Sequence, residues 1–260
     1  MERDGRMKDE SRAGLWRPVW ALVVLMFLGG CHMAGKRAAF QPDGIPRRFE
    51  RRITKTVGAQ YLVYLPEDYG GARKKWPLLI FLHGAGERGD DIERVKIHGP
   101  SHYWKKRGKQ PFIMIAPQCP EDEWWSVDVL DALLDEIVEE YPVDENRVYL
   151  TGLSMGGFAT WDWASRRPYR FAALVPICGW GNPKKVGAIR DIPVWAFHGA
   201  KDDTVALGES EKMVEALRKA GGKAKFTVYP EAKHDSWTET YNNPKVYEWL
   251  LKQKRKSRTK

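Results

Sequence analysis

The segment Gly-Leu-Ser-Met-Gly at residues 152–156 has the spacing of a nucleophile turn, in which a serine joins a strand to a helix. It follows the apolar run Val-Tyr-Leu-Thr and precedes a helical pattern that begins at Met155. The flanking glycines allow a tight backbone turn, which pushes the Ser154 hydroxyl above the sheet. We therefore predict that Ser154 is a nucleophile. The alternative is an ordinary glycine-rich turn between a strand and a helix.

A base and a carboxylate for this serine follow two later strand-like segments. His234 lies in Tyr-Pro-Glu-Ala-Lys-His-Asp, and Asp202 lies in His-Gly-Ala-Lys-Asp-Asp. An imidazole can take the serine proton, and a carboxylate can hold that imidazole in the required tautomer. The order Ser, Asp, His along the chain is a known order for such a triad. Asp203 adjoins Asp202, so the sequence leaves open which carboxylate acts.

A second glycine-rich segment, Leu-His-Gly-Ala-Gly at residues 82–86, follows another apolar run. A loop in this place can give a backbone N–H to the oxyanion that forms during acyl transfer. We predict an oxyanion hole made by the N–H groups of Ala85 and Met155. His83 is expected to brace the loop, and His198 is expected to be a packed core histidine.

Several tryptophans adjoin these segments and are candidates for substrate contacts, because an indole can stack on a sugar or an aromatic acyl group. The candidates are Trp124, Trp125, Trp180 and Trp237. The chain has 12 Trp, so several of them must belong to the core. His98 and His102 are interpreted as ordinary loop histidines.

Strand and helix patterns alternate along the chain and predict a mostly parallel, twisted sheet of about eight strands with helices on both faces. In such sheets the active site lies at the carboxyl ends of the strands. The expected strands are Phe49–Val57, Gln60–Leu65, Pro77–Leu82, Phe112–Ala116, Arg147–Thr151, Ala172–Ile177, Pro193–Phe197 and Phe226–Tyr229. The first two are expected to form an antiparallel hairpin. The expected helices are Ser126–Tyr141, Met155–Arg166, Glu209–Ala220 and Lys245–Leu251.

Residues 1–31 predict an export signal, because basic residues precede an apolar run that is too short to span a bilayer. The run ends in Leu-Gly-Gly-Cys, which resembles a bacterial lipobox, so Cys31 is the predicted lipidation site. The alternative is an ordinary cleaved signal. Residues 32–48 predict a flexible tether, residues 49–252 the folded domain, and residues 253–260 a basic tail. We expect a membrane-anchored lipoprotein of the periplasm or cell envelope.

The formal net charge is +9, and much of the excess lies in the basic tail, which is either a solvated end or attracted to an anionic surface. The rest of the chain mixes both signs, so no nucleic-acid partner is expected. Cys119 and Cys178 follow strands that are not neighbours, so both are expected to be free, buried thiols. Neither has a Cys or His partner at metal-ligand spacing, so no metal site is expected. The oligomeric state is not readable from the sequence.

Together these segments resemble the α/β-hydrolase superfamily. More narrowly, they resemble the bacterial phospholipase/carboxylesterase and feruloyl-esterase-like group, relatives of polyhydroxybutyrate depolymerase and dienelactone hydrolase. The resemblance covers roughly residues 50–252 and rests on the stretches LLIFLHGAGERGDD, APQCPEDEWWS, RVYLTGLSMGGFATWDWA, VWAFHGAKDDTV and KHDSWTETY. It implies an α/β-hydrolase fold and a serine carboxylic ester hydrolase that works through an acyl-enzyme without a cofactor.

No long insertion precedes the strand that begins at Pro193, so we expect no large lid. This favours short-acyl or aryl esters, with acylated polysaccharide as a candidate substrate. A peptidase of the prolyl-oligopeptidase type shares the fold and the triad, but it usually carries a propeller domain, for which this chain is short. A non-catalytic lipoprotein that binds glycan through its tryptophans is opposed by the complete set of serine, aspartate, histidine and oxyanion loop.

Overall fold

The computed structural model describes residues 54–70, 74–104 and 111–255. In this part of the chain seven strands form one sheet in the order β1-β3-β2-β4-β5-β6-β7. Only the β1–β3 pair is antiparallel, and all other pairs are parallel. The strands are β1 Tyr61–Tyr64, β2 Trp76–Leu82, β3 Ile113–Pro117, β4 Val143–Leu153, β5 Ala173–Ile177, β6 Val194–Gly199 and β7 Ala224–Tyr229.

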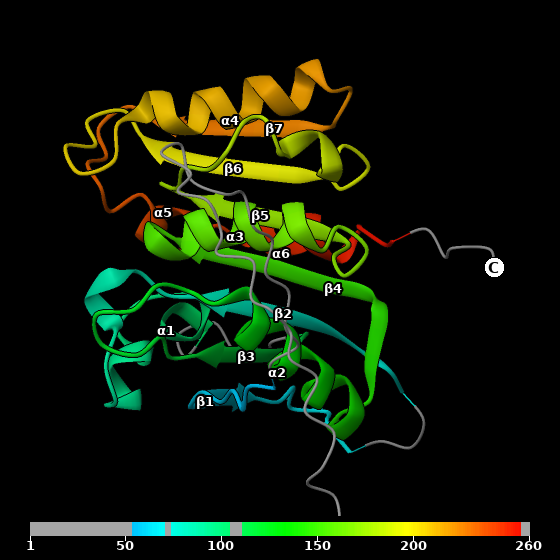
Figure 1. Ribbon diagram of the computed structural model, residues 1–260. Helices are drawn as coiled ribbons and strands as arrows, with labels where there is room; N and C mark the ends of the chain where they lie inside the picture. The colour runs from blue at the N-terminus through cyan, green and yellow to red at the C-terminus, as the bar shows by residue number, and fades with distance from the viewer. Residues whose placement is uncertain (1–53, 71–73, 105–110, 256–260) are drawn as a thin grey trace, which may run out of the picture. The chain divides into compact units, whose positions relative to one another are not determined.

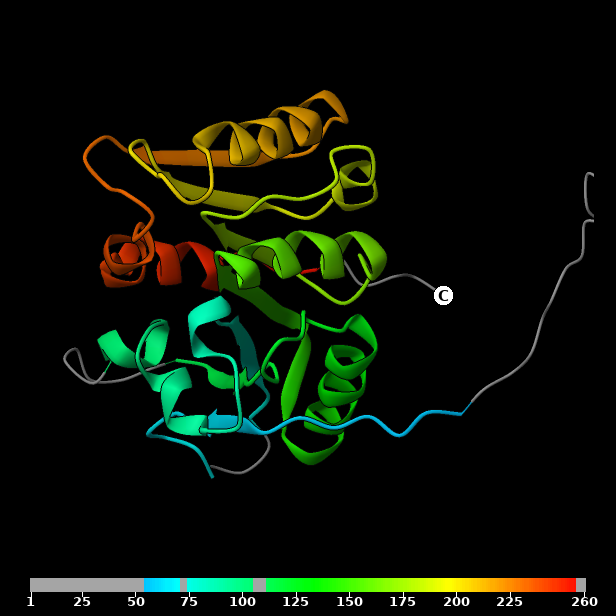
Figure 2. The ribbon, with the colours of Figure 1, turned by 60° about the vertical axis from the view of Figure 1, so that its left-hand side comes forward.

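Helices cover both faces of this sheet (Figures 1 and 2). Helices α2, α3 and α4 lie on one face, and α1, α5 and α6 lie on the other. The helices are α1 Pro100–Trp104, α2 Val127–Glu140, α3 Met155–Arg166, α4 Leu207–Lys219, α5 Trp237–Asn242 and α6 Pro244–Leu251. Three short 3-10 helices accompany them: η1 Ala85–Glu87, η2 Ile92–Lys96 and η3 Val186–Ile189. The predicted α/β architecture is thereby confirmed.

Strand β2 explains why the sheet needs both helical layers. All seven of its residues are buried, and its side chains alternate between the two faces. Leu78 and Ile80 pack in the core under α2, α3 and α4. Leu79 and Phe81 pack in the core under α1, α5 and α6. A strand that is apolar on both faces is stable only when both faces are covered.

The expected hairpin between residues 49–57 and 60–65 is wrong for the residues that the structure describes. Residues 54–60 form no strand, and β1 pairs with β3 instead, with Tyr61 opposite Pro117 and Tyr64 opposite Met114. The segment from Thr54 to Gln60 is polar and largely exposed, so it has no apolar face to bury. Residues 49–53 lie outside the described residues. The described sheet therefore has seven strands where about eight were expected.

Five of the remaining strands and the four expected helices begin and end within a few residues of their predicted bounds; β4 begins four residues earlier, at Val143. The sequence missed the short helices α1 and α5. No helix in the described part of the chain is both long enough and apolar enough to span a membrane. The predicted signal with Cys31, the tether at 32–48 and the last five residues of the basic tail fall outside the described residues.

Candidate active site

Ser154 lies on the turn between β4 and α3, with φ 52° and ψ −114°. A non-glycine residue rarely adopts this conformation, and such strain is typical of functional turns. The Ser154 N–H donates to Ile177 O at 3.0 Å, which ties the turn to the end of β5. The turn therefore presents the Ser154 side chain at the carboxyl edge of the sheet.

Two glycines are required here because backbone segments approach each other closely. A Cβ on Gly156 would lie 2.0 Å from Leu82 O, and a Cβ on Gly152 would lie 2.3 Å from Gly156 O. No real Cβ tolerates such distances. The Gly-x-Ser-x-Gly spacing thus allows α3 to start directly against the end of β2, beside Ser154.

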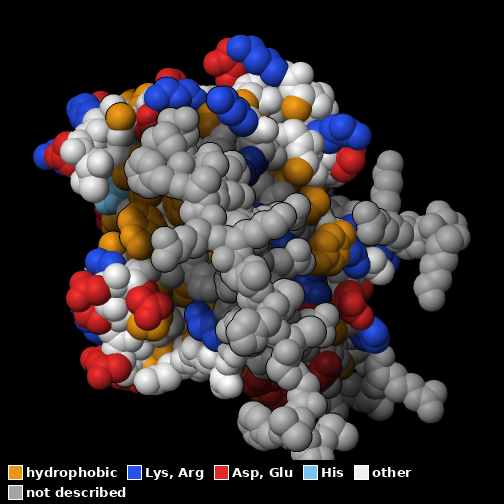
Figure 3. Space-filling model, viewed as in Figure 1, with side chains coloured by type: hydrophobic (Ala, Val, Ile, Leu, Met, Phe, Trp, Pro, Cys, Tyr) orange, Lys and Arg blue, Asp and Glu red, His pale blue; other side chains and the backbone are white. Residues whose placement is uncertain are grey.

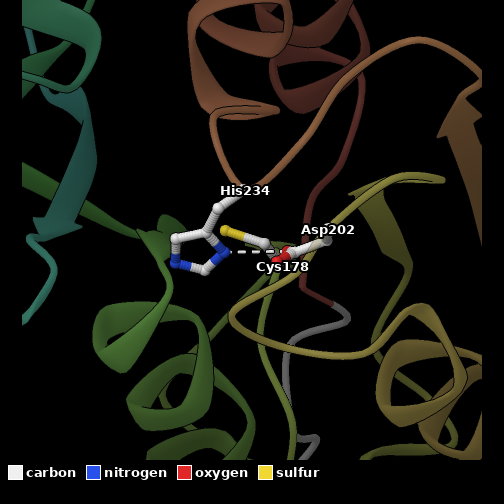
Figure 4. Close-up of side chains that lie close together, drawn as sticks. All are labelled: Cys178, Asp202 and His234. Atoms are coloured by element: carbon white, nitrogen blue, oxygen red, sulfur yellow. Dashed lines mark hydrogen bonds and ion pairs between the residues drawn. The ribbon is translucent and has the colours of Figure 1, made fainter.

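Three loops bring Ser154, His234 and Asp202 into one hydrogen-bonded chain. His234 follows β7 and Asp202 follows β6. His234 Nε2 lies 3.0 Å from Ser154 Oγ, and His234 Nδ1 lies 2.8 Å from Asp202 Oδ2. Figure 4 shows the imidazole of His234 facing the carboxylate of Asp202. The structure therefore brings together the three residues that the sequence singled out.

Of the two adjacent aspartates, only Asp202 contacts the histidine. Its side chain is fully buried, whereas the Asp203 carboxylate is mostly exposed and lies 3.8 Å from Lys233 Nζ. The geometry therefore favours Asp202 of the two carboxylates that the sequence left open.

The environment of Asp202 keeps its carboxylate ionised. Burial alone would raise the pKa of Asp202, but a hydrogen bond from His234 and two from backbone N–H groups outweigh it and hold the pKa below its usual value. The backbone donors are Thr204 and Val205, each 2.9 Å from Oδ1. Because Oδ1 is occupied by these donors, Oδ2 remains for His234.

His198 is a buried histidine, as expected, but it also contacts the acid of the chain. Its Nε2 lies 3.0 Å from Asp202 Oδ2 and 2.9 Å from Val205 O, and its Nδ1 lies 2.7 Å from Ser210 Oγ. The sequence analysis missed the contact with Asp202. The spacing of four residues across a tight turn is the signal that would have found it.

The predicted oxyanion donors begin two helices that meet at Ser154. Ala85 is the first residue of η1 and Met155 is the first residue of α3, so neither N–H has an acceptor within its own helix. A Cβ on Gly84 would lie 3.6 Å from Ser154 Cβ, which places the loop that carries Ala85 directly beside the serine. This placement is compatible with the predicted oxyanion hole.

His83 braces that loop. Its Nε2 accepts the N–H of Cys119 at 3.0 Å, so its proton is on Nδ1, which donates to Gly84 O at 2.6 Å. Burial lowers the pKa of His83 to about 4, so the ring is neutral at physiological pH. These contacts agree with the expected structural role.

Aromatic side chains cluster around Phe158, which lies in α3 close to Ser154. The Trp124 ring packs edge-on against Phe158 at 5.8 Å and against Trp180 at 6.1 Å. Trp124 is 56% exposed. Hydrophobic side chains reach the surface at the left-hand edge in Figure 3, where the strands of Figure 1 end. Phe158 was missed by the sequence analysis, although it lies one helical turn after Ser154.

The other two candidate tryptophans contact the site's own residues. Trp125 packs on the His83 ring at 4.8 Å, and its Nε1 donates to His83 O at 3.2 Å. Trp237 packs edge-on against His234 at 5.3 Å and lies 5.3 Å from His98. The structure thus places Trp124 and Trp180 in the aromatic cluster and gives Trp125 and Trp237 supporting positions.

One group of described residues has ligand atoms close enough to share a metal ion, namely Cys178, Asp202 and His234, within 4.8 Å of one another. These residues do not fit a resident metal. Burial raises the pKa of the Cys178 thiol to about 12, whereas metal binding requires the thiolate. Both His234 nitrogens are already engaged with Asp202 and Ser154. Cys119 and Cys178 are free and buried, as expected.

The parallel sheet, the strained serine turn and the loops after β6 and β7 define an α/β-hydrolase fold. Residues 116–256 match the model of the dienelactone hydrolase family, and the chain belongs to this family. A solved structure described as a thermostable esterase is 36% identical with a TM-score of 0.67, over 75% of this chain and 59% of that one.

Two curated relatives are more distant. A bifunctional acetylxylan esterase/xylanase of Neocallimastix patriciarum is 28% identical over 62% of this chain, which spans 24% of that protein's length. A probable feruloyl esterase C of Aspergillus niger is 23% identical over 70% of each chain. Both names state an esterase activity, and they differ in the acyl group that they state.

Proposed function

We propose that this protein is a serine carboxylic ester hydrolase with Ser154 as nucleophile, His234 as general base and Asp202 as the orienting acid. The observation that carries the proposal is the chain of two hydrogen bonds, 2.8 Å and 3.0 Å long, that links Asp202 through His234 to Ser154. Membership of the dienelactone hydrolase family supports it.

In the proposed mechanism, Ser154 Oγ attacks the ester carbonyl while His234 Nε2 takes the serine proton. The N–H groups of Ala85 and Met155 stabilise the oxyanion of the tetrahedral intermediate. His234 then protonates the leaving alcohol, and an acyl-serine remains. Water attacks this ester with His234 as the base, which releases the acid and restores Ser154.

The arrangement around Ser154 favours an aryl or short acyl group. His234 must reach the leaving oxygen, so the alcohol lies on its side of Ser154. The aromatic cluster of Trp124, Phe158 and Trp180, which includes a residue of the helix that begins beside Ser154, is the candidate acyl-binding surface. Aromatic rings there can stack on an aryl acyl group. The acetylxylan and feruloyl esterases among the relatives support an acylated polysaccharide as substrate.

The test compares wild type with Ser154→Ala on p-nitrophenyl acetate, methyl ferulate, acetylated xylan and a proline amide. We expect wild type to cleave esters but not the amide, and Ser154→Ala to lose at least about 10⁴-fold in kcat. Ser165→Ala is the matched control, because Ser165 lies near the end of the same helix, α3. Cleavage of the amide alone, or full activity of Ser154→Ala, would overturn the proposal.

We also propose that Cys31 is lipidated and anchors the protein to a membrane, as the Leu-Gly-Gly-Cys segment indicates. The test is metabolic labelling with an alkyne fatty acid in a bacterial host, followed by separation of membrane and soluble fractions. Wild type should carry the label and sediment with membranes, and Cys31→Ala should do neither. An unlabelled wild-type protein would refute the anchor.

A further inference from the structure

The loop from His83 to Arg88 has an unusual hydrogen-bonding pattern: every one of its six carbonyl oxygens accepts a bond from a side chain. The bonds are Trp125 Nε1 to His83 O (3.2 Å), His83 Nδ1 to Gly84 O (2.6 Å), Arg88 Nε to Ala85 O (3.1 Å), Arg94 Nη2 to Gly86 O (2.7 Å), Gln118 Nε2 to Glu87 O (3.0 Å) and Arg94 Nη1 to Arg88 O (2.6 Å). Loops usually run over the surface, where water can satisfy such carbonyls. Here the protein itself fixes the loop.

The consequence for the oxyanion donor follows from peptide geometry. In a trans peptide the C=O and the N–H point in opposite directions. The carbonyl of the Gly84–Ala85 peptide is held by His83, so the Ala85 N–H must point the other way. Ala85 is exposed, and its neighbour Gly84 lies against Ser154. The hydrogen bond to Gly84 O thus determines the direction of the Ala85 N–H.

The preceding peptide is fixed at both ends. Its carbonyl, His83 O, accepts from Trp125, and its N–H, on Gly84, donates to Glu87 Oε2 at 2.9 Å. Glu87 is only 7% exposed, and a buried carboxylate is costly unless it is hydrogen-bonded. The Glu87 side chain therefore folds back onto its own loop and occupies the Gly84 N–H, so that Ala85 is left as the donor to substrate.

Arg94 reaches the loop from a separate element, η2. One nitrogen of its guanidinium bonds Gly86 O and another bonds Arg88 O, so a single planar group spans the loop's second half. Gln118, at the end of β3, bonds Glu87 O and also Asp91 O. Neither of these side chains bonds Ser154 or His234.

We propose that Glu87, Arg88, Arg94 and Gln118 are positioning residues that aim the Ala85 N–H at the developing oxyanion. They set the rate of acyl transfer without touching substrate. This inference rests on the proposed esterase activity. It assigns a task to the Gly-Glu-Arg-Gly stretch at residues 86–89, which the triad leaves unexplained.

The experiment measures ester hydrolysis by the variants Arg94→Met and Gln118→Met, with Arg218→Met as the matched control. Arg218 also bonds a backbone carbonyl through two nitrogens, but it ties the end of α4 to Ala224 at the start of β7. Each protein is titrated with a fluorophosphonate to count active serines, so that kcat is expressed per titrated site. The affinity for phenylboronic acid, whose serine adduct places an oxygen in the oxyanion hole, is measured in parallel.

We expect Arg94→Met to lower kcat per titrated site by about 10- to 100-fold with little change in KM, because a misaimed donor is lost only in the transition state. Gln118→Met should show a smaller loss in the same direction. The inhibition constant for the boronate should rise by a similar factor as kcat falls. Arg218→Met should change neither quantity. If Arg94→Met does not fold, Arg94→Lys, which cannot span two carbonyls, replaces it with the same expectation.

A purely structural role would give a different result. It would reduce the fraction of titratable serines while kcat per site and the boronate constant stayed within about twofold of wild type, and that outcome overturns the proposal. Failure of the esterase assignment is separate, because wild type itself would then neither hydrolyse esters nor react with the fluorophosphonate.

Discussion

Two segments of the molecule share the pattern His-Gly-Ala-x-acid and perform different tasks. Residues 83–87 follow β2, and residues 198–202 begin with the last two residues of β6. In both, the histidine is fully buried and the acid four residues later approaches it, at 4.0 Å for His83 and Glu87 and at 3.0 Å for His198 and Asp202. The same local solution therefore ends two strands of one sheet.

The difference lies in what the acid binds. Glu87 bends back to the Gly84 N–H of its own loop, so the segment displays backbone donors. Asp202 is held on one oxygen by the N–H groups of Thr204 and Val205, and its other oxygen faces His234. The longer side chain, Glu87, bonds within its own loop, whereas the shorter one, Asp202, bonds a residue of another loop. One pattern thus builds a loop of donors in one place and presents a carboxylate in the other.

The largest effect should come from removing the charge of Asp202, the acid that faces His234. Asp202→Asn keeps the size of the side chain, but an amide offers an N–H to His234 and favours the wrong tautomer, so kcat should fall by about 10⁴-fold. Measuring kcat for p-nitrophenyl acetate checks this.

Asp203→Asn is the matched control for that variant. The Asp203 carboxylate is exposed and pairs with Lys233, so its loss should leave kcat within about twofold of wild type. A large loss in Asp203→Asn together with a small loss in Asp202→Asn would reverse the geometric assignment.

The glycines of the two segments should respond unequally to alanine. A Cβ on Gly199 would lie 2.1 Å from Lys233 O, a backbone atom in the loop that carries His234. A Cβ on Gly84 would meet Leu153 Cδ1 at 2.8 Å, which is the end of a flexible side chain. We expect Gly199→Ala to displace His234 and to lower kcat by about 100-fold or more, and Gly84→Ala by about 10-fold.

Steady-state kinetics on both glycine variants, with crystal structures where they fold, decide the comparison. Equal losses would mean that a clash with the backbone at Gly199 and a clash with a side chain at Gly84 disturb the site equally, and the expected difference between the two segments would fail.

The sequence could single out the three residues of the hydrogen-bonded chain because each of them follows a strand in a short local motif. The Gly-x-Ser-x-Gly turn needs only neighbours within the motif and the close approach of Leu82. Once the strands are assigned as parallel, the carboxyl ends that carry Asp202 and His234 must meet at the same edge.

The features that the sequence missed depend on long-range pairing or on side-chain direction. The partner of β1 is β3, about fifty positions along the chain, and nothing within Tyr61–Tyr64 specifies it. The fold-back of Glu87 depends on its χ angles, and the same residue type could equally have faced solvent. The short helices α1 and α5 have five and six residues, too few for a helical period to stand out.

The smallest expected effect concerns the histidine of the donor segment and is a change in the pH dependence of stability. Burial lowers the pKa of His83 from 6.5 to about 4, so between these values the unfolded chain binds a proton that the folded protein excludes. Stability should therefore rise with pH across this window, and at pH 5 the cost relative to neutral pH should be about 2 kcal/mol.

In His83→Gln the group that titrates is gone, so this part of the pH dependence should disappear, although the variant starts less stable at pH 7 because a ring hydrogen bond is lost. Urea unfolding of both proteins at pH 7 and pH 5 measures the difference. If wild type and His83→Gln lose the same free energy of unfolding between these pH values, His83 does not contribute to the acid sensitivity. The donor segment would then not depend on a neutral His83 ring, contrary to what the hydrogen bonds from Nδ1 and to Nε2 imply.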